Sequence, residues 1–564
     1  MIMFHKYIKA LLALILLSGS VNFSSAQEIE PDLTEQPFGE YLTGRHALFN
    51  HQYDVAADNY LEAIKQDPEN IELMQFSLSV FIAAGRFEDA FFVNEKLKEM
   101  AAQNEVSNIL DFFNKTKNKS YIEALIDIDE LSSTGIMNLI KPFFRAWIDA
   151  AEGSTSEIDA VVNSFEEENN FNFFNFFQAG LIYEYLEDFE KAESFYAQAL
   201  NERGLLNLRA VEAYGKILKK NGKTEKAISI LEDYIDQAPA NEQLKATLIE
   251  VRNDEQFEPF VSSLDEGFAE IFYTVSTILM QDNVKSIATN FLQYAAFFKP
   301  EFPLVHFLQA QIFESDQYYR GAQNEFDKIK TDSPLYFQSK LQRAWLYNDM
   351  DRPEGTIAAL LKLEKEYPDN REVLNSIAEF YRMNERFAEA IPAYSKVIDN
   401  IEEENVRDWI IYYTRGIVFD QEKRWAEAEM DFKKALEIRP EQPMVLNYLA
   451  YSWVDRGLNY VEAKKMLIRA VELRPNDGYI VDSLGWALYK MGGYEEAVPV
   501  LERAAQLETQ DWAINDHLGD AYWTVGRKNE ARFQWRHALS LSPDEDKIDL
   551  IKSKIKDGYT KPEI

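Results

Sequence analysis

Few residues in this sequence suggest chemistry by their type and spacing. None of the six histidines forms His-Glu-x-x-His, the pairing that places two zinc ligands on one face of a helix. Cysteine is absent, which excludes a thiolate nucleophile, a thiolate metal site and a disulfide. We therefore predict no catalytic residue, no metal site and no cofactor, and we expect a protein that is not an enzyme.

Two further patterns are weak candidates for ligand binding. Gly222-Lys223-Thr224 resembles the end of a phosphate-binding loop, but Ile217 replaces the glycine required five residues before Gly222, and no strand precedes it. His517 and His537 can approach each other across one repeat, but no carboxylate cluster with ligand spacing accompanies them. We interpret Gly222 as the end of a helix and both histidines as ordinary repeat residues.

The charge of the chain limits its partners. Its 564 residues include 59 Lys and Arg against 95 Asp and Glu, a net charge of −36. Nucleic-acid binding needs clustered positive charge, so we expect no nucleic-acid partner. The acidic surface has two interpretations, a well-solvated exterior or a preference for basic partners.

The N-terminus has the organisation of a signal peptide. Lys6 and Lys9 precede the apolar run from Ala10 to Leu17, which is too short to span a bilayer, and Ser24-Ser25-Ala26 fits a cleavage site. Removal of residues 1–26 deletes two lysines and no acid, which gives a mature charge of −36 − 2 = −38. No later stretch is apolar for long enough to span a membrane, so we expect a soluble periplasmic protein without an integral membrane segment.

The elements of the chain follow an internal repeat. Alanines recur at intervals of 34 residues, the period of tetratricopeptide repeats (TPRs), as in Ala56, Ala90 and Ala124 and in Ala463, Ala497 and Ala531. Each unit carries two apolar stripes with helical spacing, and small residues stand where two helices approach closely. We predict an all-α TPR solenoid, a right-handed superhelix of thirteen or fourteen helix-turn-helix repeats.

Irregular intervals divide this array. We expect an N-terminal TPR array over residues 27–260 that is partly degenerate, a C-terminal array over 261–543, and a soft break near 250–262. Gly85, Gly222, Gly492 and Gly526 each precede a repeat alanine by five residues, where a first helix ends in the left-handed conformation that glycine tolerates. Residues 544–564 are predicted to form a capping helix at Glu545–Lys556 and a tail.

The segment Leu446–Ser540 carries the most specific resemblance. It reads LNYLAYSWVDRGLNYVEAKKML, then GYIVDSLGWALYKMGGYEEAVPVLERA, then INDHLGDAYWTVGRKNEARFQWRHAL. It resembles proteobacterial periplasmic TPR proteins, including the lipoprotein adaptors that deliver substrates to C-terminal processing proteases. The chain departs from these adaptors because it has no cysteine to carry a lipid.

The resemblance implies a binding face. In a TPR superhelix, positions 2, 5, 9 and 12 of each first helix point into the concave groove, and a position-5 asparagine often holds a peptide backbone. The predicted peptide- or protein-binding residues are Asn375, Asn447, Asp482 and Asp516 at position 5, Tyr451, Trp486 and Asp520 at position 9, and Tyr489 and Trp523 at position 12. The alternative is that the polar members only bond neighbouring helices.

The phenylalanine-rich run at 171–177 is a second candidate. The register of the 34-residue repeat places Phe176 in the core. It places Phe174 and Phe177 at the inward positions 2 and 5. The run is either an oversized core or an apolar docking patch in the middle of the groove.

These observations predict a non-enzymatic adaptor or scaffold of the bacterial cell envelope. Its expected partners are proteins or extended peptides, including a C-terminal processing protease or envelope assembly factors, and it would present substrates to the protease. The alternative is a structural component of a secretion or outer-membrane assembly complex.

Overall fold

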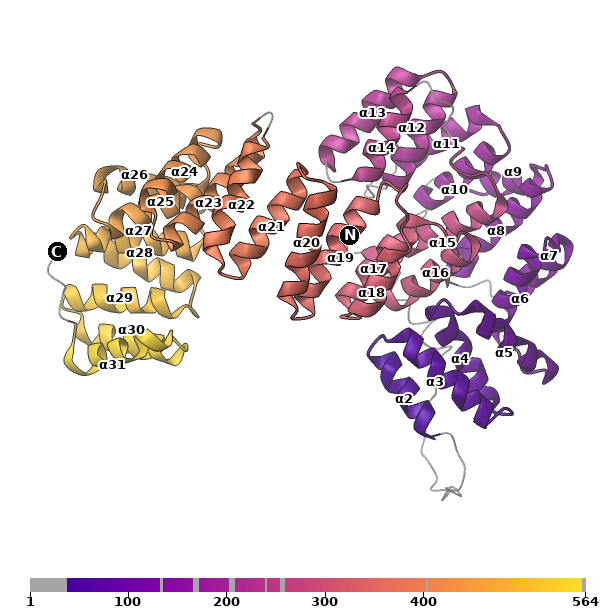
Figure 1. Cartoon of the computed structure of the whole chain (residues 1–564), viewed down its shortest axis with the longest axis horizontal. Helices are drawn as coiled ribbons and strands as arrows, with labels where there is room; N and C mark the ends of the chain where they lie inside the picture. Colours follow the sequence, from indigo (N-terminus) through magenta and orange to yellow (C-terminus); the bar gives the residue numbers. More distant parts are fainter. Residues whose placement is uncertain are drawn as a thin grey trace. The chain divides into compact units, whose positions relative to one another are not determined.

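The computed structural model describes residues 38–131, 135–165, 172–201, 208–238, 241–253, 259–401 and 404–559 (Figure 1). The predicted signal peptide, residues 1–26, lies outside the described residues. Throughout the described ranges the regular elements are helices, and no strand occurs. The chain divides into two compact units between Pro353 and Glu354.

The first unit begins with a series of antiparallel helix pairs. Its helices up to residue 253 are α2 (Phe38–Phe49), α3 (Tyr53–Gln66), α4 (Ile71–Ala83), α5 (Phe87–Glu99), α6 (Glu105–Lys117), α7 (Tyr121–Glu130), α8 (Gly135–Ala151), α9 (Ser156–Asn163), α10 (Asn172–Tyr185), α11 (Phe189–Asn201), α12 (Leu208–Lys220), α13 (Thr224–Gln237) and α14 (Glu242–Arg252). Each even-numbered helix from α2 to α12 packs against the helix that follows it. The predicted degenerate repeat at 240–260 contributes only α14 among its described residues.

A second series continues to residue 353. Its helices are α15 (Leu264–Gln281), α16 (Lys285–Phe298), α17 (Pro303–Ser315), α18 (Tyr319–Asp327) and α19 (Tyr336–Asp349). Helices α15 and α16 form one pair, and α17 and α18 form the next.

The second unit contains the most regular pairs. Its helices are α20 (Pro353–Glu366), α21 (Arg371–Met383), α22 (Phe387–Asp399), the 3-10 turn η1 (Val406–Asp408), α23 (Trp409–Gln421), α24 (Trp425–Ile438), α25 (Pro443–Asp455), α26 (Tyr460–Leu473), α27 (Gly478–Lys490), α28 (Tyr494–Leu507), α29 (Trp512–Thr524), α30 (Lys528–Ser540) and α31 (Glu545–Asp557). Pairs run from α21–α22 to α29–α30, and α31 packs on α30. Helix α31 occupies the residues that were predicted to form a capping helix.

Close helix packing explains the small residues of the repeat. A Cβ atom on Gly519 of α29 would lie 2.4 Å from Nε1 of Trp535 on α30, closer than any real contact allows. Trp535 is fully buried there, so the indole of the second helix occupies the space that glycine leaves on the first. Gly85, Gly222, Gly492 and Gly526 all have positive φ, between 70° and 88°, as predicted for the ends of first helices.

The first unit does not continue as an open series after α14. Helix α15 packs against α8 and α10, and α16 packs against α4, so this later pair lies on first helices of the earlier array. Phe112 and Phe113 of α6 contact Phe268 and Phe272 of α15 at ring distances of 5.8 and 5.4 Å. A Cβ atom on Gly267 would lie 2.4 Å from the Trp147 ring, which shows how closely α15 approaches α8. Helices α15 and α16 therefore cover the inward face of the first array.

This arrangement bears on the predicted division at residue 260. The expected break at 250–262 lies within the first unit, because α15 and α16 pack into the array that precedes them. The boundary between the two compact units falls after Pro353, beyond the aromatic core that joins α15 and α16 to the earlier helices. The proposed arrays at 27–260 and 261–543, considered as folding domains, stay a prediction.

Candidate functional site

The nine predicted binding residues lie on first helices of the second unit. Asn375 is the fifth residue of α21, and Asn447, Asp482 and Asp516 are the fifth residues of α25, α27 and α29. The remaining members are Tyr451 on α25, Trp486 and Tyr489 on α27, and Asp520 and Trp523 on α29. Direct packing of α25 on α27 and of α27 on α29 makes the predicted face continuous over these three helices.

Three of the nine residues form no hydrogen bond through their side chains within the described ranges. Asn375, Asn447 and Tyr451 are partly exposed, and their side chains form no hydrogen bond to any described residue. Burial, followed by the charges of Asp455 and Asp482, raises the pKa of Tyr451 to about 12, so its hydroxyl stays protonated and can donate. Oδ1 of Asn447 is buried without a partner among the described residues, so the groups that a ligand can reach are Nδ2 of Asn447 and the side chains of Asn375 and Tyr451.

A second set forms a stacked cluster between α27 and α29. The indole of Trp486 lies nearly parallel to the His517 ring, with centroids 4.0 Å apart, and nearly parallel to Tyr489 at 4.9 Å. Nδ1 of His517 is 2.9 Å from Oδ2 of Asp482, and the Tyr489 hydroxyl is 2.9 Å from Oγ1 of Thr524. His517, predicted to be an ordinary repeat residue, contacts both Asp482 and Trp486.

His517 carries a shifted pKa because of these neighbours. Burial lowers the pKa of its imidazole, but the carboxylates of Asp482, Asp516 and Asp520 outweigh burial and raise the pKa above the ordinary value. Asp482 is only 8% exposed and is engaged by His517. The Asp482 carboxylate therefore bonds a residue of the neighbouring helix α29.

The third set holds the capping helix. Lys554 of α31 places Nζ 2.7 Å from Oδ2 of Asp516 and 2.9 Å from the Asp520 carboxylate, and the lysine side chain is only 4% exposed. Nε1 of Trp535 donates to Asp520 at 2.9 Å. Burial, followed by the charge of Asp516, raises the pKa of Asp520 to about 6. Both aspartates therefore bind helix α31 of the same chain.

Trp523 also faces the end of the array. It stacks at 5.5 Å on Trp535, and a Cβ atom on Gly558 would lie 2.1 Å from its ring. The cations Lys528 and Arg532 lie about 5 Å from the same ring. Trp523 thus packs against the segment after α31, and it is less accessible than a groove anchor should be.

Three further exposed residues adjoin the predicted binding residues. Ile410, Met444 and Tyr479 are each the second residue of their helix, α23, α25 and α27, and they are 51%, 41% and 56% exposed. The second and fifth residues of a helix lie on the same face, so these side chains adjoin the predicted line. The signal was present in the sequence, because position 2 was expected to point inward.

The phenylalanine-rich run belongs to the core of the first unit. Phe174 and Phe177 are fully buried, and Phe177 contacts Tyr196 and Phe260. Phe176 is partly buried between Phe165 and Phe195, and Phe171 lies outside the described residues. The docking-patch alternative is therefore wrong, because residues of the same chain cover the inward faces of Phe174 and Phe177.

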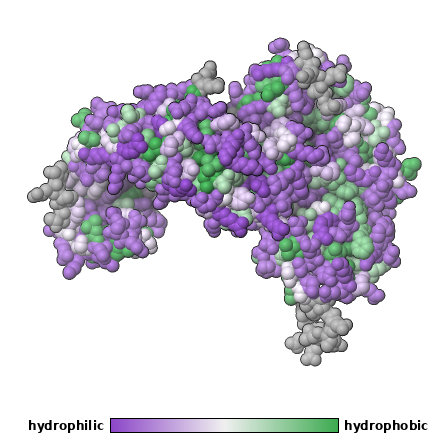
Figure 2. Space-filling view, viewed as in Figure 1, coloured by the Kyte–Doolittle hydropathy of each residue, from purple (hydrophilic) through white to green (hydrophobic). Residues whose placement is uncertain are grey.

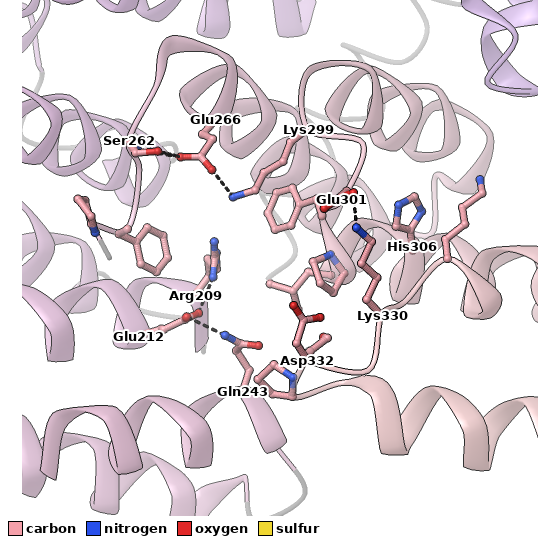
Figure 3. Close-up of a pocket in the computed structure, with 18 of the residues that line it drawn as sticks. Arg209, Glu212, Gln243, Ser262, Glu266, Lys299, Glu301, His306, Lys330 and Asp332 are labelled. Atoms are coloured by element: carbon pink, nitrogen blue, oxygen red, sulfur yellow. Dashed lines mark hydrogen bonds and ion pairs between the residues drawn. The ribbon is translucent and has the colours of Figure 1, made fainter. Parts of the chain in front are cut away.

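A cavity of about 420 Å³ remains open in the first unit (Figure 3). Ion pairs join its walls: Lys299 contacts Glu266, Lys330 contacts Glu301, and Arg209 contacts Glu212. Cations and carboxylates thus neutralise each other around it. Among the residues that the structure describes, no group of three or more His, Cys, Asp or Glu side chains is placed to hold a metal ion.

The visible surface of the chain is mainly hydrophilic. In Figure 2, hydrophilic residues dominate the visible face, and apolar residues form small separate groups. Within the described ranges, no helix combines the length and the apolar character needed to cross a bilayer.

Comparisons with known proteins agree on the repeat. Tetratricopeptide-repeat family models match residues 177–242, 369–441 and 483–543. A TPR repeat-containing protein of Pseudomonas aeruginosa is 26% identical over 188 residues, which is 33% of this chain and 31% of that protein. The chain thus spans about a third of the length of this relative.

Solved structures of repeat proteins show low overall similarity. Yeast Tom70 is 14% identical, with 93% of this chain and 95% of that chain covered and a TM-score of 0.30. The Cut9–Hcn1 hetero-tetramer of APC/C is also 14% identical, with 93% and 97% covered and a TM-score of 0.36. YrrB, described as a TPR protein with an unusual peptide-binding site, is 21% identical over 35% of this chain and 98% of that chain, with a TM-score of 0.28.

The helix pairs and the family matches define the class of protein. The chain carries tetratricopeptide repeats, and its fold is an all-α TPR solenoid, as predicted. This architecture stacks helix pairs into extended surfaces that bind other proteins. The closer resemblance to periplasmic protease adaptors stays a prediction.

Proposed function

We propose that this chain is a non-enzymatic adaptor of the bacterial cell envelope that holds an extended segment of a partner protein in the groove of its second unit. The observation that carries the proposal is that the side chains of Asn375, Asn447 and Tyr451, on first helices of this unit, are partly exposed and form no hydrogen bond within the described residues. Polar groups on a folded surface usually bond a neighbour or water, and a peptide backbone supplies both donors and acceptors. These three side chains are therefore suited to bonding the main chain of a bound peptide.

Binding should depend on Asn447 and Tyr451. We expect the double variant Asn447→Ala and Tyr451→Ala to lose most partner capture, by about tenfold or more, because both side chains would bond the bound segment. The test places a photo-crosslinking residue at Tyr479 in the exported protein and compares the cross-linked products with and without the double change. Neither side chain supports a neighbouring helix by a hydrogen bond, so helical content should be unchanged.

A cross-linker outside the predicted binding face serves as the control. A cross-linker at Phe533, which is 66% exposed on the second helix α30, reports contacts away from the groove. Equal capture at Tyr479 with and without the double change, or capture at Phe533 alone, would contradict the groove. We propose a C-terminal processing protease or its substrates as the captured proteins, and recovery of stable assembly or secretion components would favour the structural alternative.

The envelope part of the proposal depends on export. The basic, apolar and small-residue regions of residues 1–26 support cleavage after Ala26. We expect the protein isolated from its native cell to begin at Gln27 and to fractionate with the periplasm. Mass spectrometry of its N-terminal peptide checks this, and an intact Met1 start in the cytoplasmic fraction would end the envelope proposal while leaving the groove untouched.

A further inference from the structure

Three successive first helices, α23, α25 and α27, each carry an exposed apolar residue in their first turn, and these residues, Ile410, Met444 and Tyr479, are called the stripe. All three occupy the second position of their helix and are between 41% and 56% exposed. The stripe does not extend to the first helices on either side. The second residue is the charged Glu372 on α21 and the small Ala513 on α29. Three large apolar side chains at one register position are more than a soluble surface needs.

The polar groups beside the stripe restrict what it can bind. Asn447 and Tyr451 lie on α25, three and seven residues after Met444, on the same face of the helix. Their side chains form no hydrogen bond within the described chain. An α-helical ligand satisfies its own backbone groups, whereas an extended ligand leaves its N–H and C=O groups available. The stripe with Asn447 and Tyr451 therefore favours an extended ligand.

The spacing of the stripe restricts the ligand further. Helices in direct contact, such as α25 and α27, have axes about 8–10 Å apart. A polyproline II chain rises about 3.1 Å per residue and repeats every three residues, so it presents one face about every 9 Å. In a β-strand the same face recurs about every 6.6 Å, which does not match the helix spacing.

We propose that the stripe binds a segment in polyproline II conformation with an apolar side chain at every third residue. This inference rests on the proposed groove and names the ligand that the groove takes. Charge complementarity adds that the segment is basic at its ends, because the chain carries a net charge of −36.

Designed peptides test the spacing. The first is a fluorescein-labelled peptide with leucine at every third position, prolines between the leucines and a lysine at each end. The second has the same composition with leucine at every second position. We expect the mature protein to bind the first peptide at least about tenfold more tightly in fluorescence anisotropy, because only its leucines align with successive helices. Equal binding of both peptides, or tighter binding of the second, would overturn the inference.

Variants locate the site. Met444→Asp with Tyr479→Asp should weaken binding of the first peptide by about tenfold or more, since it places charges where apolar side chains dock. Met430→Asp is the matched control, because Met430 is 63% exposed on the second helix α24 and should leave binding unchanged. Unchanged binding in the stripe variant, with helical content intact, would also overturn the inference.

The outcomes separate this inference from the proposed function. If Asn447→Ala with Tyr451→Ala weakens both peptides but the stripe variant weakens neither, the groove binds peptides and the assignment of the stripe is wrong. If no groove variant changes peptide binding or partner capture, the proposed groove itself is wrong.

Discussion

Replacing Lys554 by methionine is expected to lower the free energy of unfolding of the C-terminal repeats by about 3–5 kcal/mol at neutral pH. The lysine side chain is 4% exposed and bonds both Asp516 and Asp520. Removal of the ammonium leaves two carboxylates facing each other in a buried site. Circular dichroism during urea unfolding measures the loss, and hydrogen exchange should place it in α29, α30 and α31.

The loss should depend on pH in a defined direction. Burial and Asp516 raise the pKa of Asp520 to about 6, above the value of an unfolded aspartate, and Lys554 opposes that rise. A carboxyl whose folded pKa is raised gains stability as pH falls, because the folded state then binds more protons than the unfolded state. Without Lys554 the pKa rises further, so the deficit should be largest above about pH 7 and should shrink as pH falls toward 5.

Two controls make this result specific. Lys552→Met lies on the same helix with its side chain 59% exposed, so it should change stability by less than about 0.5 kcal/mol. Adding Asp516→Asn and Asp520→Asn to Lys554→Met should restore most of the loss, because neutral amides replace the opposed charges. A deficit that stays constant between pH 5 and pH 8 would show that the three groups act only through packing.

The second large effect is expected in the core of the first unit. Phe272→Ala should cost about 3–5 kcal/mol, because it removes a ring that lies between several helices and leaves a cavity. Phe272 is 2% exposed and contacts Phe113 on α6, Phe144 on α8 and Tyr294 on α16 at ring distances between 5.3 and 5.6 Å. The matched control is Phe92→Ala on α5, where the ring is 54% exposed and the loss should be small.

The extent of the effect distinguishes this unit from a linear array. In an open solenoid each repeat contacts only its neighbours, so a substitution weakens protection locally. Here α15 and α16 contact α4, α6, α8 and α10, so Phe272→Ala should reduce hydrogen-exchange protection in those helices as well. Loss of protection confined to α15 and α16 would contradict a shared core.

Local signals in the sequence predicted the repeat and its ends. The 34-residue interval of small residues predicted paired helices, because a second-helix ring such as that of Trp535 needs the space beside Gly519. The alternation of charges with Ile548, Leu550, Ile551 and Ile555 predicted the cap that α31 forms. The aligned register also predicted which face of each first helix carries Asn375, Asn447 and Tyr451.

Contacts between distant residues decided the rest. The repeat register could not show that Lys554 would bond Asp516 and Asp520, or that His517 would bond Asp482. The position of a residue in a repeat does not reveal which distant side chain contacts it. The covering of the first array by α15 and α16 was equally hidden, since their apolar stripes have the same helical period as any other pair. The sequence by itself determined the all-α repeat, the turns and the inward register, because these follow from neighbouring residues. The tertiary structure alone decided which inward residues stay accessible, because that depends on where the chain returns to pack on itself.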